Sequence, residues 1–318
     1  MNKTLALGLD LGGTKIAAGI VDASGRVLSA LRIPTPANGV RQDLAGLFDA
    51  AHSAVNAAGI PWKSVRAVGV GVPGAFDPKT RTVWAPNLPG WKRVPLESLL
   101  GRTLRKPVFV EGDRNVQALA EAWLVHPLAH NLVFLTVGTG IGAGIIADGR
   151  VVSGSRGVAG AAGWMAIERQ WQTRFARIGC LEALGAGPAV TRLARKAARK
   201  NPRSALGDFL RSGQNLTAEQ VVLAARRGDG TARRVLEEVG LNLGRGVAGI
   251  ISLLNPEIVV LGGGLAGGGR LILDPLRTAA RKWGQPLASN QVRIVRSALG
   301  EDAGILGAAR YALLNQDV

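Results

Sequence analysis

Residues 7–22 read LGLDLGGTKIAAGIVD. An apolar run short enough for a buried strand meets the turn Gly12-Gly13, and a second apolar run follows at once. This pattern predicts two strands joined by a turn without side chains, and the backbone N–H groups of such a turn can approach an anion closely. A phosphate-binding loop and a plain β-hairpin with a glycine turn both explain the stretch.

Polar side chains surround this first turn. Thr14 adds a hydroxyl group and Lys15 a positive charge. Asp10 lies beside them, where a carboxylate can hold a hydrated magnesium ion. These residue types suit a phosphate-binding loop, but this stretch alone supports the plain hairpin equally well.

A second copy of the pattern decides between the two. Residues 132–150 read LVFLTVGTGIGAGIIADGR and repeat the order of strand, Gly/Thr turn, strand and acidic hairpin, which indicates an internal duplication. A third glycine turn follows the strand-like residues 258–261 and suits the close approach of a nucleotide. The three turns consist of Gly12 and Gly13; Gly138, Thr139 and Gly140; and Gly262, Gly263 and Gly264.

Length and composition set the broad class. The chain has 318 residues, enough for two domains with cores of their own, and no secretory or membrane segment is visible. Cys180 is the single cysteine, so no internal disulfide can form. We therefore expect a cytoplasmic protein without a membrane partner.

The formal net charge of +17 would attract nucleic acid, anionic substrates or polyphosphate. The basic residues are scattered, however, and the densest cluster, residues 192–203, predicts a helix with a solvated basic face. Aromatic residues are too few to interleave with this cluster as base-stacking platforms. An anionic partner stays open.

Apolar spacing and turn residues predict the other elements. Helices are expected over residues 42–58, 114–125, 188–200, 218–227 and 231–254, strands over 65–72, 107–111 and 292–295, and a closing helix from about residue 303.

Two residues in this framework have both a structural and a functional interpretation. Asn87 lies in a proline-rich loop between Trp84 and Trp91, where the amide could contact a polyol or the tryptophans could simply anchor the loop. Asp113 follows a strand and precedes a helix, where it could cap the helix or deprotonate an attacking hydroxyl in phosphoryl transfer.

The motifs together resemble the ROK family (repressor, open reading frame, kinase) of bacterial sugar kinases. The resemblance covers nearly the whole chain and rests on residues 9–15, 69–74, 85–91, 138–142, 179–182, 255–257 with 262–264, and 302–304.

The resemblance implies an α/β protein with the duplicated actin-like, hexokinase-like (ribonuclease H-like) fold, in which two α/β domains surround a cleft. The first domain would span residues 1–122 with the helix at about 303–318, and the second residues 123–302. The implied reaction transfers the γ-phosphoryl group of ATP, with Mg²⁺, to a sugar hydroxyl. A homodimer is implied too. The repressor branch carries an N-terminal helix-turn-helix, whereas here the phosphate motif starts within ten residues of Met1, so we expect no specific DNA binding.

Carried over residue by residue, the resemblance assigns Asp10 to magnesium through water. Gly12, Gly13, Thr14 and Lys15 would form the first phosphate loop, Gly138, Thr139 and Gly140 the second, and Gly262, Gly263 and Gly264 would lie by the adenosine. Asp113 matches the catalytic base and a sugar contact, while Asn87 and Glu182 match sugar ligands.

The sugar pocket departs from the family pattern. Gly112, Ala161 and Trp164 stand where the family has asparagine, glutamate and histidine. The cysteine motif for zinc aligns with residues 173–180 and keeps only Cys180, so we expect no zinc. Trp164 would either contact a less hydroxylated sugar ring or fill the space of the zinc site beside Phe175.

Each lost hydrogen bond to a sugar hydroxyl typically changes discrimination by about 1–3 kcal/mol, so glucose is not expected to be the best substrate. Three functions stay open: an ATP-dependent kinase for an atypical sugar or polyol, a non-catalytic sugar or nucleotide sensor, and a polyphosphate-dependent sugar kinase.

Overall fold

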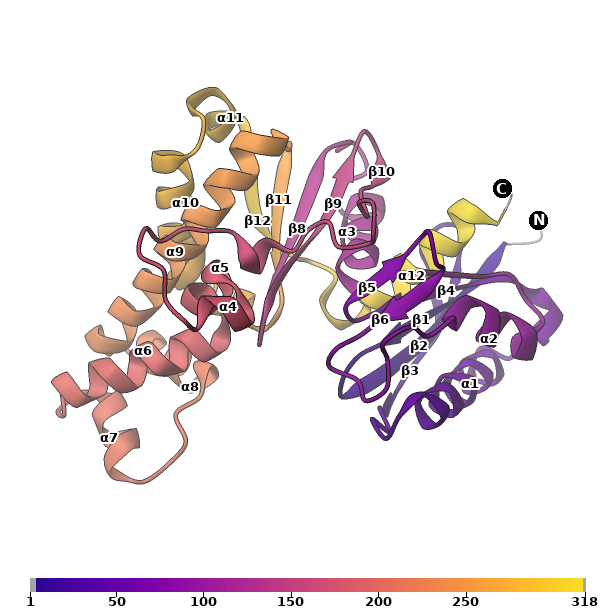
Figure 1. The fold of residues 1–318 in the computed structure, drawn as a ribbon, viewed down its shortest axis with the longest axis horizontal. Coiled ribbons are helices and arrows are strands. Elements are labelled where there is room, and N and C mark those ends of the chain that lie inside the picture. Colours follow the sequence, from indigo (N-terminus) through magenta and orange to yellow (C-terminus); the bar gives the residue numbers. More distant parts are fainter. Residues whose placement is uncertain (1–3, 317–318) are drawn as a thin grey trace. The chain divides into compact units, whose positions relative to one another are not determined.

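The computed structural model describes residues 4–316, which form two compact units (Figure 1). Unit 1 contains the described part of Met1–His130 and Ala298–Val318 together with Gly144–Gly160, and unit 2 contains Asn131–Ala143 and Ala161–Ser297. The predicted domain boundaries at residues 122 and 302 stay a prediction. No helix within the described residues is long and apolar enough to cross a membrane.

Unit 1 is built on the first half of the duplication. Its strands are β1 (Leu5–Leu11), β2 (Lys15–Asp22), β3 (Val27–Pro34), β4 (Val65–Val72), β5 (Ala75–Asp77), β6 (Thr82–Trp84), β7 (Val108–Gly112) and β10 (Arg150–Val151). Its helices are α1 (Val40–Ala57), α2 (Leu96–Leu104), α3 (Asp113–Leu124) and α12 (Ala303–Asn315).

Unit 2 contains more helix than unit 1. Its strands are β8 (Leu132–Val137), β11 (Ile258–Gly262) and β12 (Arg293–Arg296), and β9 (Ile141–Ala147) begins in unit 2 and ends in unit 1. Its helices are α4 (Phe175–Ile178), α5 (Cys180–Gly185), α6 (Gly187–Lys200), α7 (Ala205–Arg211), α8 (Ala218–Arg226), α9 (Gly230–Leu254), α10 (Arg270–Trp283) and α11 (Pro286–Gln291).

The strand order confirms the internal duplication. Within residues 4–316, one five-stranded sheet has the order β3-β2-β1-β4-β7 and a second has the order β10-β9-β8-β11-β12. Strands β1 and β8 therefore hold the same central place, and each is followed by a glycine turn and the next strand out. The first and second phosphate turns lie at equivalent positions in the two sheets.

Strand β1 separates large from small side chains by its two-residue alternation. Its leucines, together with Leu47 of α1 and Leu100 of α2, form one core cluster. On the opposite face, Ala6 packs with Ile305 and Leu306 of α12. This face carries small residues on three neighbouring strands, namely Ala6, Gly8, Ala17, Gly19, Ala67 and Gly69. Helix α12 can therefore pack very close to the sheet.

The predicted elements are found with boundaries shifted by one or two residues, and the strand at 65–72 matches β4 without a shift. Sequence reasoning missed α2, α4, α5, α7, α10 and α11 and the short strands β5 and β6; α4 and α5 have only four and six residues. Helices α7 and α11 are short, α2 contains Gly101, and α10 contains Pro275 in its interior. Glycine and proline both oppose helix formation, so these helices depend on packing rather than on local preference.

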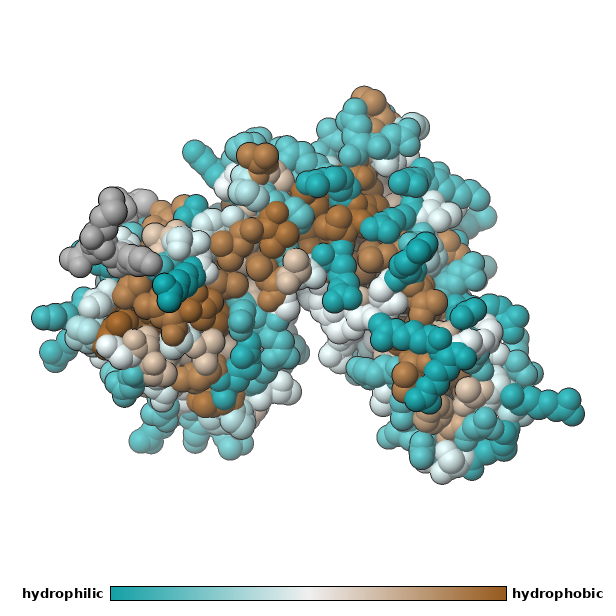
Figure 2. All heavy atoms as spheres, turned by 180° about the vertical axis from the view of Figure 1, so that it is seen from behind, coloured by the Kyte–Doolittle hydropathy of each residue, from teal (hydrophilic) through white to brown (hydrophobic). Residues whose placement is uncertain are grey.

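Hydrophilic side chains are spread over the face shown in Figure 2, around apolar patches.

Close packing predicts opposite results for two Gly→Ala substitutions in unit 1. A Cβ atom on Gly8 would lie 2.0 Å from the carbonyl oxygen of Ile305, whereas on Gly101 of α2 its nearest neighbour would lie 3.6 Å away. We expect Gly8→Ala to lower the free energy of unfolding by about 2 kcal/mol or more, because α12 must shift. Gly101→Ala should raise it by up to about 1 kcal/mol, because alanine favours helix. Urea unfolding of both variants measures the two changes, and equal effects would contradict the packing argument.

Candidate active site

The first phosphate turn is held by its own backbone and by one side chain. The Gly12 N–H donates to the Lys15 carbonyl oxygen at 2.9 Å, and the Thr35 hydroxyl donates to the Gly12 carbonyl oxygen at 2.7 Å. Gly13, Thr14 and Lys15 are exposed, and the Lys15 ammonium lies 3.1 Å from the Glu301 carboxylate. The turn therefore presents exposed polar groups from a fixed backbone.

Two carboxyl groups lie close together at the end of β1. A Cβ atom on Gly71 would lie 3.3 Å from Asp10 Oδ1 and 3.8 Å from the Cα atom of Asp113. Burial and the nearby Asp113 raise the pKa of Asp10 from its ordinary value of 3.8 to about 7, against the smaller opposing effects of Lys15 and Arg32. Burial also raises the pKa of Asp113, although Arg114 acts to lower it. Both acids bind protons more tightly than free aspartate does.

The interpretation of Asp113 as the N-cap residue of α3 is wrong. The N-cap of α3 is Gly112, which has an extended backbone, and Asp113 is the first helical residue. Its Oδ1 accepts a hydrogen bond from the adjacent Arg114 N–H at 2.8 Å. Since the side chain does not cap the helix, its role is not explained by helix formation.

A buried glutamate holds the backbone before Asp113. Glu111 Oε1 accepts from the Gly112 N–H at 2.7 Å and from Asn115 Nδ2 at 3.0 Å, and its Oε2 accepts from the Ser153 hydroxyl at 2.6 Å. This network connects the end of β7 with the first turn of α3. It therefore restricts the backbone that carries Asp113.

The loop with Asn87 also belongs to unit 1. Leu88 and Trp91 are buried, whereas Asn87 is exposed. The loop thus presents the predicted sugar-binding amide to solvent while its apolar residues are in the core.

The second phosphate turn belongs to unit 2 and is held differently from the first. The Gly138 N–H donates to the Gly140 carbonyl oxygen at 2.9 Å, and the Gly187 N–H at the start of α6 donates to the Gly138 carbonyl oxygen at 2.8 Å. Glu182 Oε2 accepts from the Ile141 N–H at 2.7 Å, and burial raises the pKa of this carboxyl. Glu182 therefore supports the phosphate turn, and its role as a sugar ligand stays a prediction.

The three glycines of the third turn have different environments. A Cβ atom on Gly262 would lie 2.2 Å from the ring of Phe134, and one on Gly263 2.5 Å from the Val137 carbonyl oxygen, whereas Gly264 has no neighbour within 4 Å. Gly263 also has a φ of 80°, in the left-handed region that favours glycine. The first two glycines allow close packing on β8, and Gly264 lines a pocket.

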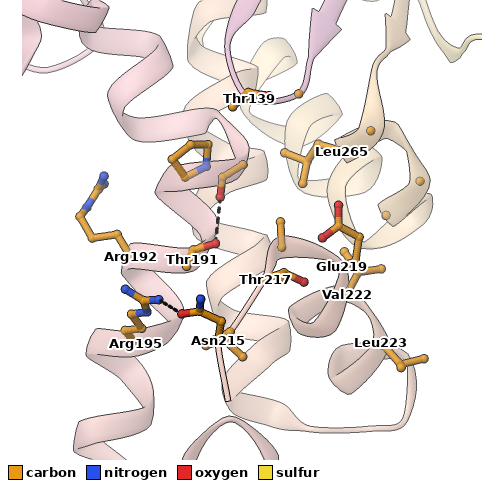
Figure 3. Close-up of a pocket in the computed structure, with 18 of the residues that line it drawn as sticks. Thr139, Thr191, Arg192, Arg195, Asn215, Thr217, Glu219, Val222, Leu223 and Leu265 are labelled. Atoms are coloured by element: carbon orange, nitrogen blue, oxygen red, sulfur yellow. Dashed lines mark hydrogen bonds between the residues drawn. The ribbon is translucent and has the colours of Figure 1, made fainter. Parts of the chain in front are cut away.

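That pocket has a volume of about 1550 Å³ and lies within unit 2. Thr139 and Leu265 lie at one end in Figure 3, α6 carries Thr191 and Arg195 along one wall, and Val222 of α8 lies across from it. The volume exceeds the 300–1,000 Å³ of ordinary small-molecule sites. The pocket therefore joins the second and third glycine turns in one cavity large enough for a nucleotide.

The basic cluster of α6 is more than the solvated face that the sequence predicted. Its cations are exposed except for the partly buried Arg192, and they line this pocket at the three- and four-residue spacing of one helix face. They are Arg192, Arg195, Lys196, Arg199 and Lys200, joined by Arg226 of α8. Helical spacing was visible in the sequence, whereas the wall opposite α6 is formed by distant residues.

These cations differ in their partners. Arg192 donates to the Ala183 carbonyl oxygen at 2.9 Å, and burial lowers the pKa of Arg192. Arg195 donates to Asn215 Oδ1 at 3.1 Å (Figure 3). Within residues 4–316, Lys196, Arg199 and Lys200 have no hydrogen-bond or ion-pair partner. Positive charge is thus available on one side of the pocket.

Trp164 does not fill a buried space at the position of the zinc site. Its side chain is 57% exposed, and Phe175 instead packs against Trp171 with ring centroids 5.9 Å apart. Phe175, Cys180 and Ala183 form a small core of their own. An apolar cluster thus occupies the aligned cysteine segment, and Trp164 stays accessible.

Metal ligands do not cluster in the described part of the chain. No group of three or more His, Cys, Asp or Glu side chains there is arranged to hold a metal ion. A cation near Asp10 would therefore take its other ligands from water and substrate, as Mg²⁺ commonly does.

Similarity to known proteins covers the entire fold. The chain matches the ROK family over residues 6–315. It is 33% identical to a glucokinase of Thermotoga maritima over 313 residues, with 97% of each chain covered. The ROK hexokinase of Thermus thermophilus superposes with a TM-score of 0.80 at 33% identity and 99% coverage of both chains. A ROK family glucokinase from Streptomyces griseus, solved with glucose and AMPPNP, gives 0.79 at 33% identity, covering 98% of this chain and 100% of that one.

The duplicated sheets and these neighbours define the α/β class with the actin-like, hexokinase-like fold, as the sequence predicted. The chain belongs to the ROK family, which confirms the resemblance drawn from its motifs.

The raised pKa of Asp10 predicts a pH-dependent gain in stability for Asp10→Asn. Because the folded state holds the proton up to about pH 7 and the unfolded chain releases it near pH 4, wild-type stability falls as the pH rises through this window. We expect Asp10→Asn to melt a few degrees higher than wild type at pH 8, and the advantage to vanish near pH 4. Thermal unfolding without divalent ions measures this, with exposed Asp49→Asn as the control. A pH-independent difference would contradict it.

Proposed function

We propose that the chain is an ATP-dependent kinase that transfers the γ-phosphoryl group to a hydroxyl of a sugar or sugar-like polyol. The observation that carries this proposal is the pair Asp10 and Asp113 at the end of β1, next to the first phosphate turn. Relatives that are sugar kinases over nearly the full length of the chain support the reaction class.

Asp113 is the proton acceptor of this reaction. A carboxylate whose pKa is raised takes a proton from a sugar hydroxyl more readily than an ordinary one does. The Glu111 network restricts the backbone before Asp113. The Asp113 side chain does not cap α3, because Gly112 is the N-cap residue. The base is therefore held in place by the backbone and by Arg114, whose Nε lies 3.6 Å from Asp113 Oδ1.

Asp10 fits a magnesium ion held through water. Its carboxyl and that of Asp113 repel each other, which a divalent cation would offset. When bound, Mg²⁺ neutralises negative charge on the phosphate groups. Gly12, Gly13, Thr14 and Lys15 bind phosphate oxygens from unit 1, and Lys15 exchanges Glu301 for phosphate.

The nucleotide occupies the pocket of unit 2. Gly138, Thr139 and Gly140 bind phosphate oxygens through the turn that Glu182 and Gly187 support. Gly264 and Leu265 lie beside the adenosine, while Gly262 and Gly263 keep this turn packed on β8.

The acceptor is a sugar that needs fewer hydrogen bonds from the protein than glucose does. Asn87 and Glu182 bind hydroxyl groups, and the exposed face of Trp164 stacks on the apolar side of the ring. Gly112 and Ala161 offer no side-chain hydrogen bonds at the two other positions where the family has polar residues. We further propose a cytoplasmic homodimer without zinc and without specific DNA binding.

Turnover of a sugar panel tests the kinase. ADP release from ATP and Mg²⁺ is measured with hexoses, amino sugars, ketoses, deoxy sugars and cyclitols. Asp113→Asn should lower kcat by about 10²–10⁴-fold, because the proton acceptor is lost, while ATP binding is kept. Wild-type kcat/KM should rise with pH through the pKa of Asp113.

Asp49→Asn of α1, an exposed residue in the same unit, is the matched control and should keep wild-type activity. ATP binding without turnover of any acceptor would instead favour the sensor.

A polyphosphate donor is the second candidate function. It is favoured by the pocket wall, where Lys196, Arg199 and Lys200 carry positive charge along one side. Residues 191–200 of α6 span about 14 Å at 1.5 Å per residue, which suits an extended chain of phosphate groups. The pocket also holds the third glycine turn, which argues for a nucleotide.

Neutralising two cations of α6 distinguishes ATP from polyphosphate as the phosphoryl donor. We expect Arg199→Gln with Lys200→Gln to raise the KM for polyphosphate by about tenfold and the KM for ATP by much less, because only the longer anion reaches both side chains. The matched control is Arg281→Gln with Lys282→Gln in the last turn of α10, outside the pocket. If wild type transfers phosphate from ATP alone, the polyphosphate candidate is excluded.

A further inference from the structure

Asp43 is a fully buried carboxylate that the proposed reaction does not use. It lies in the first turn of α1, where Gly39 caps the helix without a side-chain hydrogen bond. Its Oδ2 accepts from Trp91 Nε1 at 2.8 Å, and its Oδ1 accepts from the Ala37 N–H at 2.9 Å. One carboxylate therefore connects α1 with two separate loops.

The first of these loops carries Asn87. The Ala85 N–H donates to the Trp91 carbonyl oxygen at 2.8 Å, and the Leu88 N–H donates to the Ala85 carbonyl oxygen at 3.0 Å. These bonds close residues 85–91 into a compact loop. The Trp91 side chain, 1% exposed, is the part of this loop that reaches Asp43.

The second loop is strained where Asp43 binds it. Ala37 has a φ of 52°, in the left-handed region that alanine rarely adopts. Its N–H finds its acceptor in Asp43, so the carboxylate helps to hold this conformation. The Asn87 loop also lies against the start of α1, since a Cβ atom on Gly90 would lie 3.6 Å from the Val40 side chain.

We propose that Asp43, through Trp91, is a positioning residue that fixes the conformation of the Asn87 loop for sugar binding. A buried carboxylate needs its partners, so it holds the indole N–H more rigidly than water or a neutral acceptor would. The effect of Asp43 on sugar binding rests on the proposed function. The effect of Asp43 on the conformation of the loop does not depend on that function.

Two variants break the contact while keeping the shape of the core. Trp91→Phe removes the indole N–H and keeps an aromatic ring. Asp43→Asn replaces one acceptor oxygen by an N–H donor, so it can no longer accept from both Trp91 and Ala37.

The controls change an indole N–H and a buried carboxylate elsewhere in unit 1. Trp62→Phe removes an indole N–H that donates to the Leu104 carbonyl oxygen at 3.0 Å. Asp22→Asn changes a buried carboxylate to an amide, and because the Ser24 and Arg26 N–H groups both donate to Oδ1, the amide oxygen can keep these two bonds. These controls report general loss of stability without altering the Asn87 loop.

Hydrogen exchange of the full chain measures directly how well the amides of the Asn87 loop are protected. In both test variants, we expect the amides of Ala85, Leu88 and Trp91 to exchange at least about tenfold faster than in wild type, and to stay unchanged in the two controls. Unchanged exchange in the test variants, or equal acceleration in the controls, would overturn the inference. This result does not depend on turnover, so it still decides the role of Asp43 if the wild type phosphorylates no sugar.

Steady-state kinetics with the best sugar of the panel tests whether the conformation of the Asn87 loop affects sugar binding. The KM for the sugar should rise by about tenfold in the test variants, while the KM for ATP stays within about twofold of wild type. The controls should keep both constants even where they melt earlier. An unchanged sugar KM in Trp91→Phe and Asp43→Asn would exclude a role in positioning Asn87.

Discussion

The close approach of α12 to the small-residue face of β1 and β4 is the constraint on which the site of unit 1 depends. Gly8 and Gly69 leave no room for a Cβ atom beneath the carbonyl oxygens of Ile305 and Ala308. Asp10 is the next residue on the same face of β1, and Gly304 at the start of α12 lies against its carboxyl. The packing that builds the core therefore also desolvates this acid and raises its pKa.

The duplication reproduces the sheet but not the way in which each turn is supported. Thr35 fixes the first turn through the carbonyl oxygen of Gly12, whereas Gly187 and Glu182 fix the second. Unit 2 adds α6 and α8, whose facing surfaces form a basic pocket that begins at Thr139. Equivalent turns thus belong to different surroundings: carboxyl groups and cations lie together near the first turn, whereas cations predominate in the pocket of the second. This asymmetry suits a reaction in which phosphate groups and a hydroxyl need different partners.

Motifs that depend on backbone shape were predictable from the sequence. The glycine turns, the strand β4 and the closing helix follow from local rules and were placed within a residue or two. Roles that depend on distant partners were not. Glu182 holds Ile141 across 41 positions of sequence, Trp164 is exposed rather than buried, and Asp113 follows the cap instead of forming it. Nothing local to these three residues distinguishes the alternatives.

By itself, the sequence determined the internal duplication and the glycine turns, because alternation and glycine act within a few residues, and its motifs identified the family and with it the fold. The tertiary structure decided which face of α6 lines a pocket and how the Asp10 and Asp113 carboxyls affect each other. It also showed that Asp43 joins Ala37 to Trp91. Burial, pKa and long-range hydrogen bonds arise only when separate segments pack, since each depends on groups that the chain brings together from far apart.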